Sequence, residues 1–194
     1  MNEQFWWFLA RGSGVVAWLF LTASVLWGIF LSTDLFPKHR RPVWLLDLHR
    51  WLGGLTVAFV VVHVGSLIAD SYVQFDLMDV LVPFASEWQP GPVALGVLGM
   101  WGLVAVEATS LAMKRLPKRI WRGIHLMSYV TFWFSGLHGA FAGTDALRPL
   151  FVITLTVSVV GVVFAGTYRM INGRKRRRLT IPSSKAQRSV AGNL

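Results

Sequence analysis

Residues 49–63, "HRWLGGLTVAFVVVH", decide the fold of this chain. The stretch is apolar enough to lie inside a membrane-spanning helix, yet a histidine stands at each end of it, at His49 and His63. Ionisable side chains are costly in the hydrocarbon core of a bilayer and mark functional positions by default. The two histidines therefore need a partner, and the rest of the sequence indicates what that partner is.

The composition is that of a membrane protein. The chain has 194 residues, of which 54% are hydrophobic and 14% charged, whereas soluble domains carry about 25% charged residues. The net charge is +10, but the basic residues gather in short segments between apolar runs, which is typical of cytoplasmic loops and not of a nucleic-acid-binding surface. No cysteine is present, which excludes thiolate-bound clusters. We expect a multi-pass protein of the plasma membrane with no nucleic-acid partner.

Five apolar segments approach the roughly 20 residues that a helix needs to cross the hydrocarbon core. They are residues 14–32, 49–69, 91–113, 120–142 and 146–170. We therefore predict an all-α integral membrane bundle of five transmembrane helices. The N-terminal residues lack the basic region and cleavage site of a signal peptide, so the first helix is expected to be retained. The loop 71–90 is long and partly apolar, and it can hold a short helix on the outer surface.

The loops alternate in charge, which assigns an orientation. Basic residues concentrate at 38–50, 114–122 and 169–178, while the loop between the second and third segments has four acidic residues and no Lys or Arg. The positive-inside rule then places the N-terminus outside and the C-terminus inside. Residues 1–171 form the predicted transmembrane domain, and residues 172–194 a basic cytoplasmic tail that is polar enough to be disordered.

Two further histidines, His125 and His138, lie in the fourth apolar segment. The second and fourth segments run in the same direction, so His49 and His125 lie near the cytoplasmic side and His63 and His138 near the outer side. At 1.5 Å per residue the two levels are about 20 Å apart. The four histidines therefore form two facing pairs.

Two neutral imidazoles that face each other across a helical bundle are the ligand set of a six-coordinate b-type haem. We expect two stacked haems, an inner one between His49 and His125 and an outer one between His63 and His138. Hydrogen bonding between helices is the plain alternative for a membrane histidine. Zinc or copper is a weaker one, because two histidines per level are too few for a closed metal site.

The helical wheel fits one of the two segments better than the other. His49 and His63 are separated by fourteen steps of 100° and share a face, within about 40°. His125 and His138 are separated by thirteen steps and lie about 140° apart on an ideal helix. We therefore predict a π-bulge or local unwinding within residues 128–137, since such irregularities favour functional sites.

Three charged residues are candidates for supporting roles, and two of them, Arg50 and Arg122, lie at the cytoplasmic ends of the histidine-bearing segments. Arg50 and Arg122 can bind the propionates of the inner haem, since arginine makes bidentate contacts with carboxylates, or they can simply fix the topology. Glu107 is the carboxylate well inside a predicted span. It can handle protons or a quinone, but we favour an ion pair with Lys114 or Arg115.

Two stretches resemble a known family. "LHRWLGGLTVAFVVVHV" (residues 48–64) and "WRGIHLMSYVTFWFSGLHG" (residues 121–139) resemble the haem-binding helices of the ferric reductase-like transmembrane domain. That family includes NADPH oxidases, ferric-chelate reductases and the haem subunit of the bacterial periplasmic methionine sulfoxide reductase system. The resemblance covers about residues 5–170. It implies two haem b groups, with His49 and His125 on the inner iron and His63 and His138 on the outer iron.

The resemblance also implies transmembrane electron transfer, from a cytoplasmic donor to an extracytoplasmic acceptor such as ferric iron, oxygen or a redox protein. Oxidases of the family carry a C-terminal flavin and nicotinamide domain. Here only 24 residues follow the last predicted span, without a Gly-rich dinucleotide fingerprint. We therefore expect an oxidoreductase component with no catalytic side chain of its own, whose donor is a separate flavoprotein, a bound FMN or FAD, or a quinol. The alternatives are a quinol-linked cytochrome b of the b561 type and a haem-free membrane scaffold.

Overall fold

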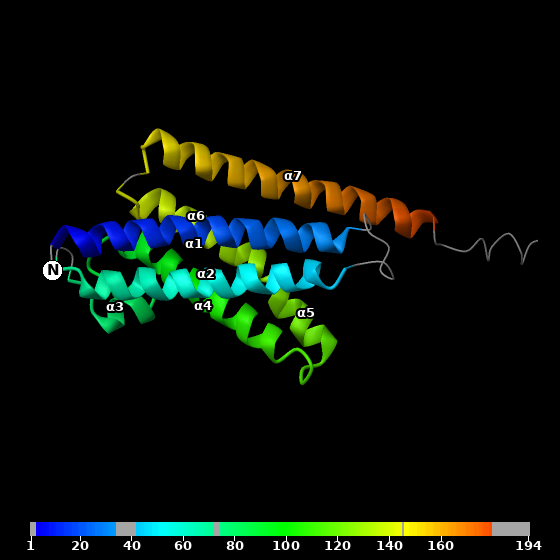
Figure 1. The fold of residues 1–194 in the computed structure, drawn as a ribbon, viewed down its shortest axis with the longest axis horizontal. Coiled ribbons are helices and arrows are strands. Elements are labelled where there is room, and N and C mark those ends of the chain that lie inside the picture. The colour runs from blue at the N-terminus through cyan, green and yellow to red at the C-terminus, as the bar shows by residue number, and fades with distance from the viewer. Residues whose placement is uncertain (1–2, 34–41, 72–73, 145, 180–194) are drawn as a thin grey trace, which may run out of the picture.

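The computed structural model describes residues 3–33, 42–71, 74–144 and 146–179 (Figure 1). Throughout these ranges the regular structure is helical, without a strand, which confirms the all-α prediction. The helices are α1 (Glu3–Ser32), α2 (Trp44–Ala69), α3 (Leu77–Leu81), α4 (Pro90–Leu111), α5 (Lys118–Leu126), α6 (Ser128–Ala142) and α7 (Pro149–Leu179).

Four of the described helices are long and apolar enough to cross a membrane. They are α1 from Gln4 to Ser32, α2, α4, and α7 from Pro149 to Asn172. Prolines help to fix where several helices begin, because proline suits the first turn and lacks the N–H that would be unpaired there. Pro90 opens α4, Pro149 opens α7, and Pro117 directly precedes α5.

The predicted fourth span is divided into two helices. Residues 118–126 form α5 and residues 128–142 form α6, and the chain turns at Met127, whose N–H donates to the carbonyl of Ile124 at 2.9 Å. This is a tight turn of the 3₁₀ type. The predicted irregularity therefore exists between His125 and His138, but its expected position within residues 128–137 is wrong, because α6 is a continuous α-helix from Ser128 onward.

Two closely packed helix pairs build the bundle. α1 packs along α2, and α4 packs along α6, with α5 continuing beside α4. Contacts between α2 and α4 are sparse. α7 lies against α1, on the side away from α2 (Figure 1). α1 is therefore the central helix, with neighbours on several sides.

The main core lies along α1. Trp18 stacks on Phe132 of α6 with ring centroids 4.6 Å apart, and the Phe132 side chain is completely buried. Val25 and Ile29 extend this core along α1, and Val162 of α7 is buried in the same cluster. Many large apolar side chains on the outer faces stay exposed, as expected of helices that face lipid.

The loop predicted to hold a short helix contains α3. Asp76 begins it with a reciprocal capping box, in which the Asp76 and Asp79 side chains each accept a backbone N–H of the other residue. Val80 packs with Val93 and Val97 of α4, and the indole N–H of Trp101 donates to the carbonyl of Leu81 at 2.9 Å. α3 is thus fastened to the side of α4.

The last helix extends into the predicted tail. α7 continues to Leu179, so residues 172–179 are helical where the sequence favoured disorder. Residues 180–194, the rest of that tail, lie outside the described residues.

Candidate functional site

The structure brings the four histidines together in the expected pairs. His49 of α2 and His125 of α5 have ring centroids 6.0 Å apart, with an interplanar angle of 75°. His63 of α2 and His138 of α6 have centroids 6.3 Å apart, with an angle of 77°. One helix therefore supplies a ring at both levels, and two successive helices supply the facing rings.

The spacing of each pair fits a shared metal ion. Two imidazoles on opposite sides of one metal have ring centres roughly 6 Å apart, because each metal–nitrogen bond is about 2.1 Å long. Within the described ranges, no three His, Cys, Asp or Glu side chains gather as a metal-binding group. Each level thus offers two axial imidazoles, and a porphyrin would supply the four equatorial nitrogens, so these residues fit a six-coordinate haem.

The outer imidazoles are held by main-chain carbonyls of the flanking helices. His63 Nδ1 lies 2.6 Å from the Ala10 carbonyl oxygen of α1, and His138 Nδ1 lies 2.9 Å from the Pro92 carbonyl oxygen of α4. A carbonyl only accepts, so Nδ1 carries the hydrogen and Nε2 of the neutral ring has its lone pair free. Metal-binding histidines have this arrangement, with the second nitrogen donating to an outer partner.

The inner imidazoles are held by serine hydroxyls of the same two helices. His49 Nδ1 lies 3.4 Å from Ser24 Oγ of α1, and His125 Nδ1 lies 3.4 Å from Ser110 Oγ of α4. The Trp121 ring also stacks on His125, with centroids 5.0 Å apart. At both levels, α1 orients the ring from α2 and α4 orients the facing ring.

Glycines let α1 and α4 approach the imidazoles closely. A Cβ at Gly14 would lie 3.0 Å from His63 Nδ1, and one at Gly96 would lie 2.7 Å from His138 Nδ1. At the inner level a Cβ at Gly28 would lie 3.2 Å from the Cε1 atom of the His49 ring. A side chain at Gly96 would force the His138 ring to shift, and one at Gly14 or Gly28 would press tightly on its ring, so the glycines belong to the site.

The sequence analysis did not find these flanking positions, although a spacing signal was present. Gly14 and Gly28 are fourteen residues apart, and so are Gly96 and Ser110. The two histidines of α2 have this same spacing. A search for small residues that repeat at the histidine interval would have identified α1 and α4 as the supporting helices.

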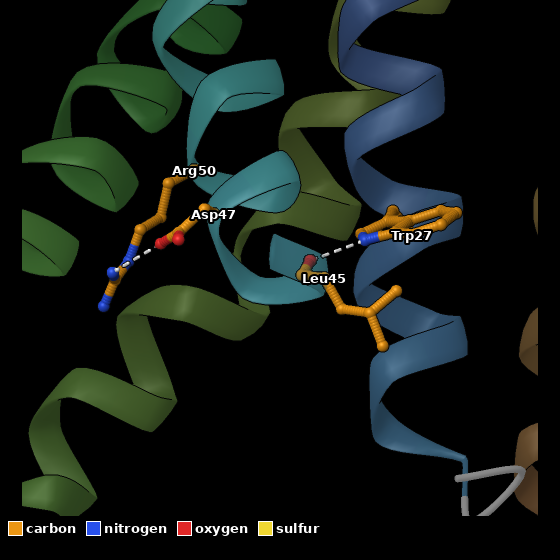
Figure 2. Close-up of polar contacts among 4 residues, drawn as sticks. All are labelled: Trp27, Leu45, Asp47 and Arg50. Carbon is orange, nitrogen blue, oxygen red and sulfur yellow. Dashed lines mark hydrogen bonds and ion pairs between the residues drawn. The ribbon is translucent and has the colours of Figure 1, made fainter. Parts of the chain in front are cut away.

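The two arginine candidates lie on exposed surfaces near the inner pair. Arg50 Nη1 donates to Asp47 Oδ1 at 3.2 Å, and both side chains are largely exposed. Figure 2 shows them on the face of α2 away from Trp27, whose indole N–H donates to the Leu45 carbonyl oxygen at 2.8 Å. Arg122 is exposed on α5. Their contact with haem propionates stays a prediction.

Glu107 does not have the partner that we favoured. Within the described residues its carboxylate makes no ion pair with Lys114 or Arg115. It reaches across to α2, where a Cβ added at Gly53 would overlap it. Gly53 is buried and lies one helical turn from His49. The Glu107 carboxylate therefore faces α2, about one helical turn along from His49.

The comparison with known families agrees with this geometry. The family described as "Ferric reductase like transmembrane component" matches residues 13–136, which is more than half of the chain. The match includes His49, His63 and His125 and ends two residues before His138. Neither the curated proteins nor the solved structures compared with the chain gave a match. With its four apolar helices, the chain is a multi-pass membrane protein that belongs to the ferric reductase-like transmembrane family.

Proposed function

We propose that this protein carries electrons across the plasma membrane through two b-type haems. The family suggests transmembrane electron transfer. The observation that carries the proposal is that two histidines face each other at each of two levels of the bundle. The ring centroids are 6.0 Å apart in one pair and 6.3 Å apart in the other. Hydrogen-bond acceptors at all four Nδ1 atoms support ligation through Nε2.

Each part of the chain has a role in this function. When bound, each haem supplies one-electron chemistry at its iron. His49 and His125 would hold the inner haem, and His63 and His138 would hold the outer haem. The histidines of α2 separate the two levels by about 20 Å along the helix. The apolar bundle around them excludes water and keeps the haem b groups in a low-dielectric environment.

The proposed topology has five membrane crossings. α5 and α6 together form the fourth crossing, with their break at Met127 inside the membrane domain of residues 1–171. The alternation of basic and acidic loops supports an external N-terminus and a cytoplasmic C-terminal segment, residues 172–194. The inner pair then faces the cytoplasm. Arg50 and Arg122 lie at that end and are proposed to bind the propionates of the inner haem. Arg50 would then break its ion pair with Asp47 and pair with a propionate instead.

Under this proposal, the cytoplasmic end of the bundle, at His49 and His125, would receive electrons, and the outer end, at His63 and His138, would release them. The proposed donor is a separate flavoprotein reductase or a flavin, FMN or FAD, bound on the cytoplasmic side. The proposed acceptor is ferric iron, oxygen or an extracytoplasmic redox protein. The chain thus acts as the membrane component of an oxidoreductase and needs a partner reductase.

The visible spectrum of the purified protein tests this proposal. We expect a Soret band, a low-spin b-type α-band on reduction, and two haems per chain. His63→Ala or His138→Ala removes the outer haem only, and His49→Ala or His125→Ala the inner haem only. His39→Ala is the matched control, because this histidine belongs to a basic stretch of sequence between two apolar segments, and it keeps both haems. A protein without a Soret band would be a haem-free scaffold.

A second candidate is a quinol-linked cytochrome b of the b561 type, and Glu107 is the observation that favours it. Its carboxylate lies between α4 and α2, one turn from His49. Oxidation of a quinol to a quinone releases two electrons and two protons, and a carboxylate at this depth can take a proton. Reduction of the haems by a quinol, lost in Glu107→Gln and not supported by a flavin reductase, would favour this candidate.

A further inference from the structure

The inner and outer pairs differ in the atoms that hold their imidazoles. The outer rings face main-chain carbonyl oxygens at 2.6 and 2.9 Å. The inner rings face side-chain hydroxyl oxygens at 3.4 Å, one from Ser24 and one from Ser110. Carbonyl oxygens at the shorter distances are the stronger acceptors. The outer partners belong to the backbone. The inner partner of His125 is a side chain and depends on the residue type, whereas His49 also has a hydrogen bond to the Ser24 backbone.

The direction of the bond is defined at Ser110. Its hydroxyl donates to the Val106 carbonyl oxygen at 2.7 Å, so its hydrogen is engaged within α4. The oxygen of Ser110 therefore faces His125 Nδ1 as an acceptor, and Nδ1 carries the hydrogen. Ser24 faces His49 at the same distance from the opposite side of the bundle. Ser24 also has a hydrogen bond to His49 through its backbone, so Ser110 is the serine whose side chain alone holds its ring.

We propose that Ser24 and Ser110 set the reduction potential of the inner haem, as positioning residues that act through His49 and His125. This inference rests on the proposed function. An acceptor on Nδ1–H makes an imidazole a better electron donor to the iron, which favours the ferric state and lowers the potential. Removal of the hydroxyl raises the potential of the inner haem and leaves the outer haem unchanged.

The expected size of the effect follows from other outer-shell partners of metal ligands. Loss of such a partner typically changes metal affinity or activity by about 10- to 100-fold. The bonds to the serines are long, so we expect the lower end of this range. A tenfold change in the ratio of ferrous to ferric inner haem at a fixed ambient potential equals about 59 mV for a one-electron couple.

The test is a spectroelectrochemical redox titration of the full chain loaded with haem. The component that remains in His63→Ala identifies the inner haem. Ser110→Ala shifts that component upward. Ser24→Ala shifts it by less, because the hydrogen bond of His49 to the Ser24 backbone remains. Thr22→Val and Thr109→Val are the matched controls, because these hydroxyls donate to carbonyls of their own helices. Neither control moves the inner potential.

An isosteric comparison separates the hydroxyl from packing. Threonine keeps the hydroxyl and valine replaces it with a methyl group, so Ser110→Thr and Ser110→Val differ only in the proposed acceptor. A higher potential of the inner haem in the valine variant than in the threonine variant supports the proposal. Equal potentials or a downward shift in the valine variant overturn it, even if both haems are present. A wild-type protein without haem would instead overturn the proposed function.

Discussion

At the residue scale, the imidazoles are oriented by α1 and α4, which approach them closely at glycine positions. Gly14 and Gly96 leave room for the outer rings, and the carbonyls of Ala10 and Pro92, four positions earlier on the same helices, accept their hydrogens. On each helix the accepting carbonyl and the glycine are thus about one helical turn apart. This repeat of acceptor and glycine explains why the site depends on α1 and α4 as much as on the helices that carry the histidines.

Gly96→Ala should remove the outer haem and spare the inner one. The new Cβ would lie 2.7 Å from His138 Nδ1, so the ring must leave its place beside α4. Haem stoichiometry and the low-spin spectrum measure the loss. Gly91→Ala is the control on the same helix, because a Cβ there meets nothing within 4 Å. Two haems with an unchanged spectrum in Gly96→Ala would contradict the assigned packing.

Gly53→Ala should destabilise the bundle by about 1–3 kcal/mol, the usual cost of overpacking. The added methyl overlaps the Glu107 carboxylate in the gap between α2 and α4. Shortening Glu107 to alanine in the same chain relieves the clash, so the double variant loses less stability than the two single variants together. Thermal unfolding in detergent measures this, and Gly54→Ala, in open space, is the control. Strictly additive losses would show that the two residues do not touch.

At the element scale, the break between α5 and α6 places both facing histidines toward α2. The sequence revealed that one straight helix could not do this, because the two positions lie about 140° apart on its surface. It did not reveal where the break falls. Met127 has no adjacent proline or glycine, and the position is set by the packing of α5 and α6 against α4. Local residue preferences therefore could not identify it.

Phe132→Ala should cost about 3 kcal/mol or more, since the side chain is completely buried and its removal leaves a cavity under Trp18. The loss appears as a lower unfolding temperature in detergent. Phe141→Ala on the same helix is the control, because Phe141 is 63% exposed. Similar effects of the two substitutions would contradict the central position of Phe132 in the core.

At the scale of the whole molecule, the sequence predicted the helical class, the membrane location and the family. Those features follow from hydropathy and from the histidine interval along α2, which are properties of single segments. The partners of the imidazoles were missed, because Ser24 and Ser110 become neighbours of His49 and His125 only when α1 and α4 pack beside them. The favoured partner of Glu107 was wrong for the same reason, since the gap between α2 and α4 is a tertiary feature.

The proposed orientation can be tested directly because the natural chain has no cysteine. Cysteines introduced singly at Ser71 and Arg115 lie at exposed positions near opposite ends of the bundle. On intact cells, a membrane-impermeant maleimide should label the chain at position 71 and leave position 115 unlabelled until the membrane is opened. The reverse pattern would place the N-terminus inside.

The joint at Met127 has a consequence for how a movement would spread through the bundle. α2 is continuous through both levels, whereas the facing ligands belong to separate helices, α5 for the inner pair and α6 for the outer pair. A movement of α5 would therefore act first on the inner pair of imidazoles, and it would reach the outer pair only through the joint at Met127 or through α4, against which both helices pack. Under the proposed function, a signal that arrives at the α5 end of the bundle would act on one level before the other.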